Sequence, residues 1–188
     1  MKRNISAKEA MQRLVEGNKK YMNALTNPGD ISPAIRKQTC ENGQSPYAII
    51  LACSDSREIP EAIFSAGIGE LFVIRVAGNV VDDHQLGSIE YAADHLGCRL
   101  VVVLGHNHCG AVDAAMNHEP DGHIKFITDE ISYAIQDEKD EFRACCLNVE
   151  HSVRVIDGNA DIKHLEEEGL EVVGAVYHLE DGRVEFLS

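Results

Sequence analysis

Two short segments, far apart along the chain, carry side chains that could together form one reactive site. The segment ACSDSRE supplies a thiol, a carboxylate and a guanidinium at Cys53, Asp55 and Arg57. The segment GHNHCGA supplies His106 and Cys109 at a spacing that lets one turn present both to a single ion. Two thiolates and one imidazole are a known zinc ligand set, which leaves the fourth tetrahedral position open for water. Each motif is weak alone, but the two motifs together predict a zinc centre.

The segments around these motifs have the apolar pattern of buried strands. Tyr47–Leu51 directly precedes the first motif and Leu100–Leu104 precedes the second, with Leu71–Val76 as a third apolar run between them. Helical patterns separate these runs, one beginning near Pro60 and one over residues 83–95. The alternation predicts a parallel sheet whose carboxyl-terminal strand ends lie at one edge. The thiols and the imidazole are therefore expected to converge there.

The two ends of the chain add a helix and a hairpin to this sheet. Ser6 and Glu9 form a capping-box pattern, and the helix that follows belongs to an arm over residues 1–30. The apolar stripe of this helix either wraps a partner subunit or packs on its own subunit. Near the other end, a DG dipeptide matches a two-residue hairpin turn that pairs Glu171–Leu179 with Arg183–Leu187.

These elements predict an α/β fold in a single domain over residues 1–188. We expect a central, mostly parallel β-sheet flanked by helices, with a C-terminal antiparallel hairpin strand and an N-terminal helical arm. Further helical patterns cover residues 124–135 and 141–156. Gly105 and Gly110 flank the second motif, and we expect them to permit a tight backbone turn.

The composition narrows the classes of partner and compartment. Of the 188 residues, 44% are apolar and 26% are charged, which is ordinary for a soluble globular protein. The net charge of −14 disfavours nucleic acid and anionic membrane surfaces as partners. Neither a signal peptide nor a membrane-spanning run is expected. A cytoplasmic location follows, in which the six cysteines are free thiols or metal ligands.

Some of these residues also have simpler explanations. The Asp55–Arg57 pair could be a salt bridge that only stiffens its turn. His108 could relay protons, or it could be an ordinary exposed loop residue. Cysteine is often a small buried hydrophobic residue, and we expect this for the cysteines outside the two motifs. These are Cys40, Cys98, Cys145 and Cys146.

The motifs CSDSR and GHNHCGA, in this order, closely resemble those of the β-class carbonic anhydrases. Other segments resemble that family as well, so the resemblance covers nearly the whole chain. LVEGNKKYM is similar to its N-terminal helix, LFVIRVAGNVV to its second strand and the following turn, and GSIEYAADHLG to its next helix. VVGAVYHLEDGRVEFL is similar to its closing hairpin.

The resemblance implies a zinc enzyme that reversibly hydrates carbon dioxide to bicarbonate and a proton. Zinc would lower the pKa of a bound water toward about 7. The resemblance also implies a homodimer or a dimer of dimers, whose pocket receives Gln44 and Tyr91 across the subunit interface. The implied site residues are the zinc ligands Cys53, His106 and Cys109, the catalytic pair Asp55 and Arg57, and the substrate-binding residues Gln44, Phe72, Ala77, Tyr91 and Gly110.

This sequence departs from the family pattern at several positions. Ala77 stands where a larger aliphatic residue is common, which would widen the pocket. Glu58 stands where a small apolar residue is usual. Ile50 and Ala52 replace the Trp and Gly of the members that bicarbonate regulates, so regulation through a noncatalytic bicarbonate site is not expected. The sequence leaves open whether Asp55 can itself bind zinc.

Two other functions stay open at this stage. The same site could hydrolyse carbon disulfide or carbonyl sulfide, because access channels and oligomer packing would decide between these substrates and CO2. The chain could instead be a noncatalytic zinc-binding or thiol redox protein. Cys53 and Cys109 do not form a Cys-x-x-Cys pair, which argues against redox chemistry.

Overall fold

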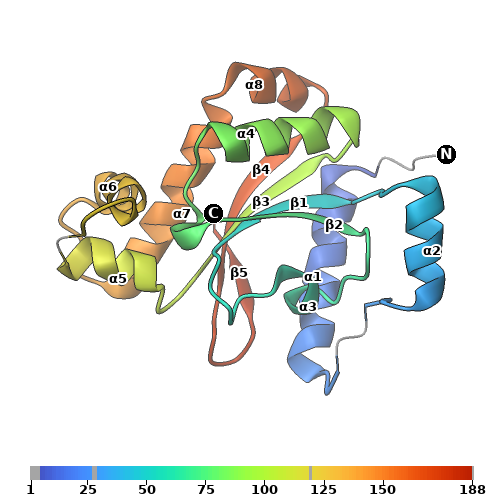
Figure 1. The fold of residues 1–188 in the computed structure, drawn as a ribbon, viewed down its shortest axis with the longest axis horizontal. Helices are drawn as coiled ribbons and strands as arrows, with labels where there is room; N and C mark the ends of the chain where they lie inside the picture. The colour runs from blue at the N-terminus through green and yellow to red at the C-terminus, as the bar shows by residue number, and fades with distance from the viewer. Residues whose placement is uncertain (1–4, 27–28, 119, 188) are drawn as a thin grey trace.

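A mixed five-stranded sheet forms the centre of the protein. The computed structural model describes residues 5–26, 29–118 and 120–187. In the sheet the strand order is β2-β1-β3-β4-β5, and the first four of these strands run parallel while β5 is antiparallel to β4 (Figure 1). The predicted α/β class, parallel sheet and antiparallel C-terminal strand are confirmed. The strands are β1 (Ala48–Ala52), β2 (Leu71–Arg75), β3 (Leu100–His106), β4 (Glu171–Tyr177) and β5 (Val184–Phe186).

Helices cover both faces of this sheet, and others gather at its ends. In Figure 1, α5 and α6 lie together at one end of the molecule and α2 lies at the opposite end. The helices are α1 (Ala7–Asn23), α2 (Pro33–Asn42), α3 (Pro60–Ile63), α4 (Asp83–Glu90), α5 (Gly110–Asn117), α6 (Ile124–Ile135), α7 (Glu141–Asp157) and α8 (Ala160–Glu167), with a 3-10 turn η1 (Ala77–Asn79) and a π-helical turn η2 (Tyr91–His95).

The central strands are apolar throughout because both of their faces are covered. All residues of β1 and β3 are buried. On one face, Ile49 and Leu51 pack with side chains from α4, α7 and α8. On the other face, Ile50 packs with side chains from α1 and α3. This alternation is the strand period of two, and double coverage explains the unbroken apolar runs that marked the strands in the sequence.

Helix α1 packs on the sheet of its own subunit. Ser6 caps it, with its side-chain oxygen accepting from the backbone N–H of Glu9 at 3.2 Å, as the capping pattern predicts. Leu14 is fully buried in the core. The buried amide of Asn18 donates to carbonyl oxygens in α3 and in the β4–β5 loop. Of the two placements expected for the apolar stripe, the structure shows the one on its own subunit.

Several local features differ from the expectations. The hairpin loop is longer than two residues, because His178 N–H bonds to Arg183 O and the DG dipeptide is only part of the loop between them. Helix α3 is a single turn. Helix α2 was not predicted, since it buries no residue and so lacks an apolar period. The sequence Asn27-Pro-Gly-Asp30 is typical of a helix break, and two of its residues, 27 and 28, lie outside the described residues. Among the described residues, no helix is both long and apolar enough to cross a membrane.

Candidate metal centre

Three buried side chains converge where β1 and β3 end. Cys53 follows β1, His106 is the last residue of β3, and Cys109 caps the amino end of α5. One thiol sulfur from each cysteine and one imidazole nitrogen lie within 4.8 Å of one another. The three residues are 4%, 1% and 2% exposed. The parallel strands thus bring Cys53 together with His106, which is 53 residues away in sequence.

The hydrogen bonding of His106 fits a metal ligand. Its Nδ1 lies 2.8 Å from the backbone oxygen of Asn107, so this nitrogen carries the proton and donates it. Nε2 is buried and has no hydrogen-bond partner in the described part of the chain. Buried polar atoms are normally satisfied, so an unpaired Nε2 beside two thiols is what a metal ion would satisfy. The Cys-His-Cys donor set, with one position left for water, suits zinc.

The two thiols share their protons unequally. A hydrogen bond from the Cys109 thiol is the largest of the effects that lower the pKa of Cys53 well below that of an ordinary thiol. The resulting thiolate in turn raises the pKa of the Cys109 thiol. Both shifts have the same physical cause, the hydrogen bond between the two sulfurs, and metal binding requires both thiols to lose their protons.

Asp55 and Arg57 form a bidentate pair beside these donors. Arg57 Nε donates to Oδ1 at 2.9 Å and Nη2 donates to Oδ2 at 2.7 Å. Asp55 Oδ2 lies 3.8 Å from His106 Nε2, so the carboxylate is next to the metal donors. The Arg57 hydrogen bond is the largest cause that holds the pKa of Asp55 well below its usual range. Arg57 Nη2 also donates to His108 O at 3.1 Å, which joins the two motifs.

Cys53 is held at its nitrogen, its oxygen and its sulfur. The carboxylate of Glu58 accepts from its backbone N–H at 2.8 Å, and Arg75 Nε donates to its carbonyl at 3.0 Å. The backbone N–H of Gly78 points at its sulfur, 3.3 Å away. Glu58 is fully buried, and burial raises the pKa of its carboxyl to about 8. The sequence marked Glu58 only as a departure from the family pattern, and this contact was not foreseen.

The turn η1 is fixed by helix α7. Asn148 Nδ2 donates to Gly78 O at 2.8 Å, and Ser152 Oγ donates to Asn79 O at 3.0 Å. Gly78 has φ 68°, and an added Cβ would come within 2.7 Å of Ile131, so glycine is required there. The sequence analysis missed the two α7 residues, although a polar pair spaced by one helical turn within an apolar face was a signal of such a contact.

The tight turn of the second motif has a different origin from the one expected. Neither Gly105 nor Gly110 has a positive φ, and the left-handed residue is His108, with φ 52°. Gly105 is needed for a different reason, because a Cβ there would lie 2.5 Å from a methyl group of Val149. Gly110 begins α5, and nothing lies within 4 Å of where its Cβ would stand. Space beside Cys109 is therefore open.

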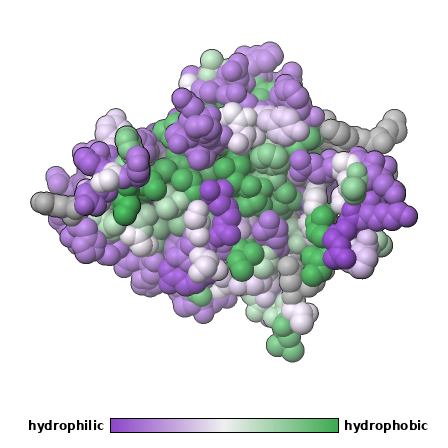
Figure 2. Space-filling model, viewed as in Figure 1, coloured by the Kyte–Doolittle hydropathy of each residue, from purple (hydrophilic) through white to green (hydrophobic). Residues whose placement is uncertain are grey.

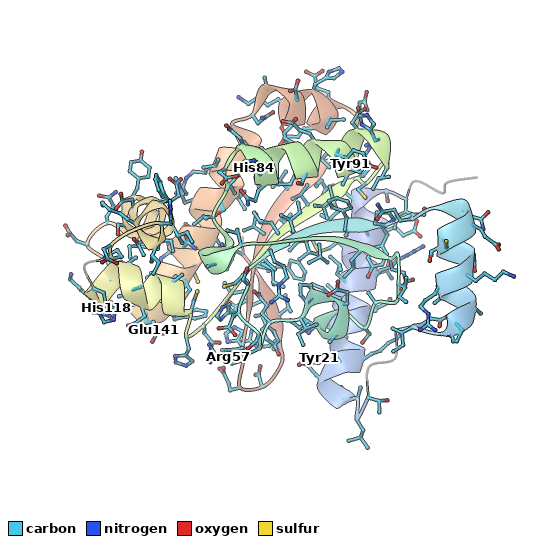
Figure 3. The ribbon with its side chains drawn as sticks, in the orientation of Figure 1. Tyr21, Arg57, His84, Tyr91, His118 and Glu141 are labelled. Atoms are coloured by element: carbon cyan, nitrogen blue, oxygen red, sulfur yellow. The ribbon has the colours of Figure 1, made fainter. Side chains whose placement is uncertain are left out.

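Three of the expected pocket residues lie far from the metal donors of their own chain. Arg75 pairs with Ala52, the residue before Cys53, whereas Phe72 pairs with Ile49. Phe72 is thus three residues, or about 10 Å along β2, from the strand end where the metal donors lie. The ring of Tyr91 lies 6.1 Å from that of Phe72, and Figure 3 shows it at the far end of α4 from Arg57. Gln44 precedes β1 and lines a groove next to α2. Ala77, in contrast, begins the turn that contacts Cys53.

The structure confirms the expected burial of three of the remaining cysteines and contradicts it for the fourth. Cys98 and Cys146 are buried, as expected. Cys145 is also buried and belongs to the same apolar cluster as Cys53 and Cys109. Cys40 is exposed, which contradicts its expected burial, because α2 has no covering element within the described residues of this chain. His108 is an exposed loop residue, and its Nδ1 lies 3.2 Å from Glu141 Oε1.

Comparison with known proteins identifies the family. A sequence model described as carbonic anhydrase matches residues 48–184. The carbonic anhydrase of Mycolicibacterium smegmatis is 35% identical, over 95% of this chain and 92% of its own length. The β-carbonic anhydrase CafA of Aspergillus fumigatus superimposes with a TM-score of 0.76 at 26% identity, covering 82% of this chain and 81% of its own. A tetrameric β-carbonic anhydrase of Sordaria macrospora gives 0.75 at 28% identity, with 96% and 95% covered.

The matched segment includes β1 to β4, the first residue of β5 and all three clustered metal donors. The Mycolicibacterium smegmatis carbonic anhydrase aligns with this chain along nearly the full length of both proteins. The solved structures reproduce the arrangement of sheet and helices. The chain therefore belongs to the β-carbonic anhydrase family.

Proposed function

We propose that zinc held by Cys53, His106 and Cys109, together with the Asp55–Arg57 pair, carries out the reversible hydration of CO2 that defines this family. The chain is a zinc-dependent carbonic anhydrase. When bound, zinc lowers the pKa of a water ligand toward neutrality and so supplies a nucleophile at physiological pH. The observation that carries this assignment is the buried, unpaired Nε2 of His106 within reach of two thiol sulfurs.

Asp55 orients the attacking water. Its carboxylate is adjacent to the metal donors and stays ionised, because Arg57 keeps its pKa low. An ionised carboxylate accepts the water's remaining proton in a hydrogen bond, which directs an oxygen lone pair toward the CO2 carbon. Arg57 keeps the carboxylate in this orientation through two parallel bonds. After attack the product is bicarbonate, and the proton released passes to buffer.

The substrate pocket is built from two copies of the chain. Ala77 and Gly110 adjoin the metal donors of their own copy and leave room for a small uncharged substrate. Gln44, Phe72 and Tyr91 lie at the opposite strand ends, so they serve the site of a partner subunit. Their position in the register supports this assignment, since a strand length separates them from the donors of the same chain.

A homodimer or a dimer of dimers follows from this shared pocket. Strand β2 is at the sheet edge, and its apolar residues Phe72, Val73 and Ile74 are only half-buried. Figure 2 has a broad hydrophobic area over β1 and β2, between α4 and α2. An apolar sheet edge of this kind normally has a partner. Helix α2 buries none of its residues, which suits an arm lying on a neighbour. Light scattering at assay concentration should give the mass of two or four chains.

Zinc analysis and substrate assays test the proposal together. Purified protein should contain about one zinc per chain and hydrate CO2, with carbon disulfide and carbonyl sulfide turned over far more slowly. Preference for a sulfur compound would select the hydrolase alternative, and zinc without turnover would select a noncatalytic protein. A cytoplasmic location remains part of the proposal, and the free state of all six cysteines supports a reducing compartment. The net charge of −14 supports small-molecule chemistry without nucleic acid or membrane partners.

A further inference from the structure

Glu58 is a fully buried carboxyl group at the metal centre that the mechanism above does not use. Its exposed fraction is 0%. Removing a carboxyl group from water is costly unless it gains strong partners. One oxygen, Oε2, accepts from the backbone N–H of Cys53 at 2.8 Å. The other, Oε1, has no hydrogen-bond partner in the described part of the chain. The buried Glu58 side chain therefore costs folding free energy and makes one hydrogen bond within the described residues. That bond is to the backbone of Cys53, a metal ligand.

Glu58 also closes the loop that carries the catalytic pair. Its own backbone N–H donates to Asp55 O at 3.1 Å, while its side chain returns to the N–H of Cys53. Arg75 binds the same loop from the other side, through the carbonyl oxygens of Cys53 and Asp55. The backbone from Cys53 to Glu58 is thus tied at both ends, and Glu58 supplies one of the two ties.

The tie acts on the position of the Cys53 sulfur. With the nitrogen held by Glu58 and the carbonyl by Arg75, the backbone has little freedom to rotate. The backbone N–H of Gly78, in the η1 turn, then donates to the Cys53 sulfur. A ligand whose backbone is fixed before metal arrives loses less conformational freedom on binding, so the metal is held more tightly. Partners of metal ligands typically change metal affinity by about 10- to 100-fold when removed.

We propose that Glu58 is a positioning residue of the metal centre, whose buried carboxyl oxygen holds the Cys53 backbone so that its sulfur is in place to bind zinc. The proposal rests on the assignment of zinc to Cys53, His106 and Cys109. It predicts that the rate of zinc release depends on a hydrogen-bond acceptor at position 58, and that charge and bulk at this position matter less.

Three variants separate these contributions. Glu58→Gln keeps an oxygen that can accept from the Cys53 N–H. Glu58→Leu has similar bulk and no acceptor. Glu61→Leu is the matched control, because Glu61 is an exposed carboxylate on the neighbouring helix α3 and has no contact with the donors. If Glu58→Leu does not fold, Glu58→Val, which is smaller, replaces it in the comparison.

The first measurement is the rate at which zinc-loaded protein transfers zinc to an excess of a metallochromic chelator. Glu58→Leu should release zinc at least about 10-fold faster than the wild type. The zinc-release rate of Glu58→Gln should stay within about threefold of the wild-type rate, and that of Glu61→Leu should equal the wild-type rate. Cobalt-substituted protein gives a second readout, since its thiolate-to-cobalt absorption reports the geometry of the two bound sulfurs, of which only that of Cys53 has its backbone held by Glu58. The absorption should change in Glu58→Leu and be conserved in Glu58→Gln.

Two outcomes overturn the proposal. A folded Glu58→Leu with wild-type zinc release and cobalt absorption would show that Glu58 has no effect on the metal. Equal acceleration in Glu58→Gln and Glu58→Leu would show that the charge acts and the hydrogen bond does not. Failure of the zinc assignment itself is distinguishable, because wild-type protein would then hold no zinc, or Cys109→Ala would hold as much as the wild type.

Discussion

Arg57 donates three hydrogen bonds to Asp55, two from its guanidinium at 2.9 and 2.7 Å and one from its backbone N–H at 2.8 Å. Oδ1 accepts two of these bonds and Oδ2 accepts the third, so the contacts favour the ionised form of Asp55. The Asp55 side chain is 18% exposed and the Arg57 side chain 54%. The carboxylate therefore stands between the buried metal donors and solvent, in the place where a water molecule would have to enter.

The first prediction concerns Asp55→Asn. The amide has nearly the same size, but it carries no charge and can present a donor toward the water. We expect zinc to stay bound while CO2 hydration falls by more than about tenfold, a barrier increase above about 1.4 kcal/mol. Stopped-flow hydration and metal analysis on the same preparation measure both. Activity retained between about pH 6 and about pH 9 would reduce the pair to a structural salt bridge.

The second prediction concerns the acid stability of Arg57→Gln. Because the pKa of folded Asp55 lies below its unfolded value of about 3.9, the pair adds stability above that value and loses it as pH falls through the folded pKa. Without Arg57 the folded pKa rises toward the unfolded value, so the pair's contribution to stability above that value is largely absent and acid unfolds the variant at a higher pH. We expect the acid-unfolding midpoint of metal-free protein to rise by roughly a few tenths of a pH unit, since a pair that is partly exposed to solvent contributes only weakly to stability.

Circular dichroism during acid titration measures this midpoint. Arg36→Gln is the matched control, because Arg36 is an exposed arginine on α2 whose side chain donates, within the described residues, only to the backbone oxygen of Ile31. Its midpoint should equal that of the wild type. A shift toward lower pH in Arg57→Gln would contradict the assigned role of Arg57 in lowering the Asp55 pKa.

The third prediction is that Cys109→Ala loses most of its zinc and nearly all CO2 hydration, because only two protein ligands would remain. Metal content should fall from about one zinc per chain to below about a tenth. Cys145→Ala is the control, since Cys145 is a buried thiol of the same apolar cluster and is not one of the three converging donors. It should keep its zinc. Full occupancy in Cys109→Ala would remove this residue from the site.

The metal donors could be predicted from sequence because their placement depends on local signals. Two apolar runs that alternate with helices define parallel strands, and a parallel sheet gathers the ends of its strands at one edge. The positions of Cys53 and His106 at this edge could be predicted from these strand patterns alone. The donor role of Cys109 followed from its spacing to His106. The same logic gave the antiparallel hairpin, although the dipeptide signal was wrong about the loop length.

The supports of the site could not be predicted in this way, because they depend on packing between distant segments. Asn148 reaches Gly78 across 70 residues, and no local pattern specifies that meeting. His108 takes the left-handed conformation that the flanking glycines were expected to supply. Glu58 violates the rule that buried positions are apolar, and such violations mark functional sites more often than they mark folding elements.

The last prediction is that a site can be rebuilt from two differently damaged chains. Cys109→Ala destroys the metal site of its own chain but keeps Gln44 and Tyr91. A Gln44→Ala/Tyr91→Ala double variant keeps its metal donors but lacks the residues proposed to reach across the interface. In a mixed dimer, the metal donors of the second chain would face the intact residues of the first, which makes one complete site.

Co-expression of the two variants with different tags tests this pocket directly. Each variant alone should have less than about a tenth of wild-type activity. Random pairing makes half of the dimers mixed with one complete site each, so activity should recover to about a quarter of the wild type. Cys53→Ala co-expressed with Cys109→Ala is the control, because Cys53 and Cys109 serve the same chain's metal and no pairing restores both. Activity no higher than the average of the two parents would contradict the shared pocket and place Gln44 and Tyr91 in the site of their own chain.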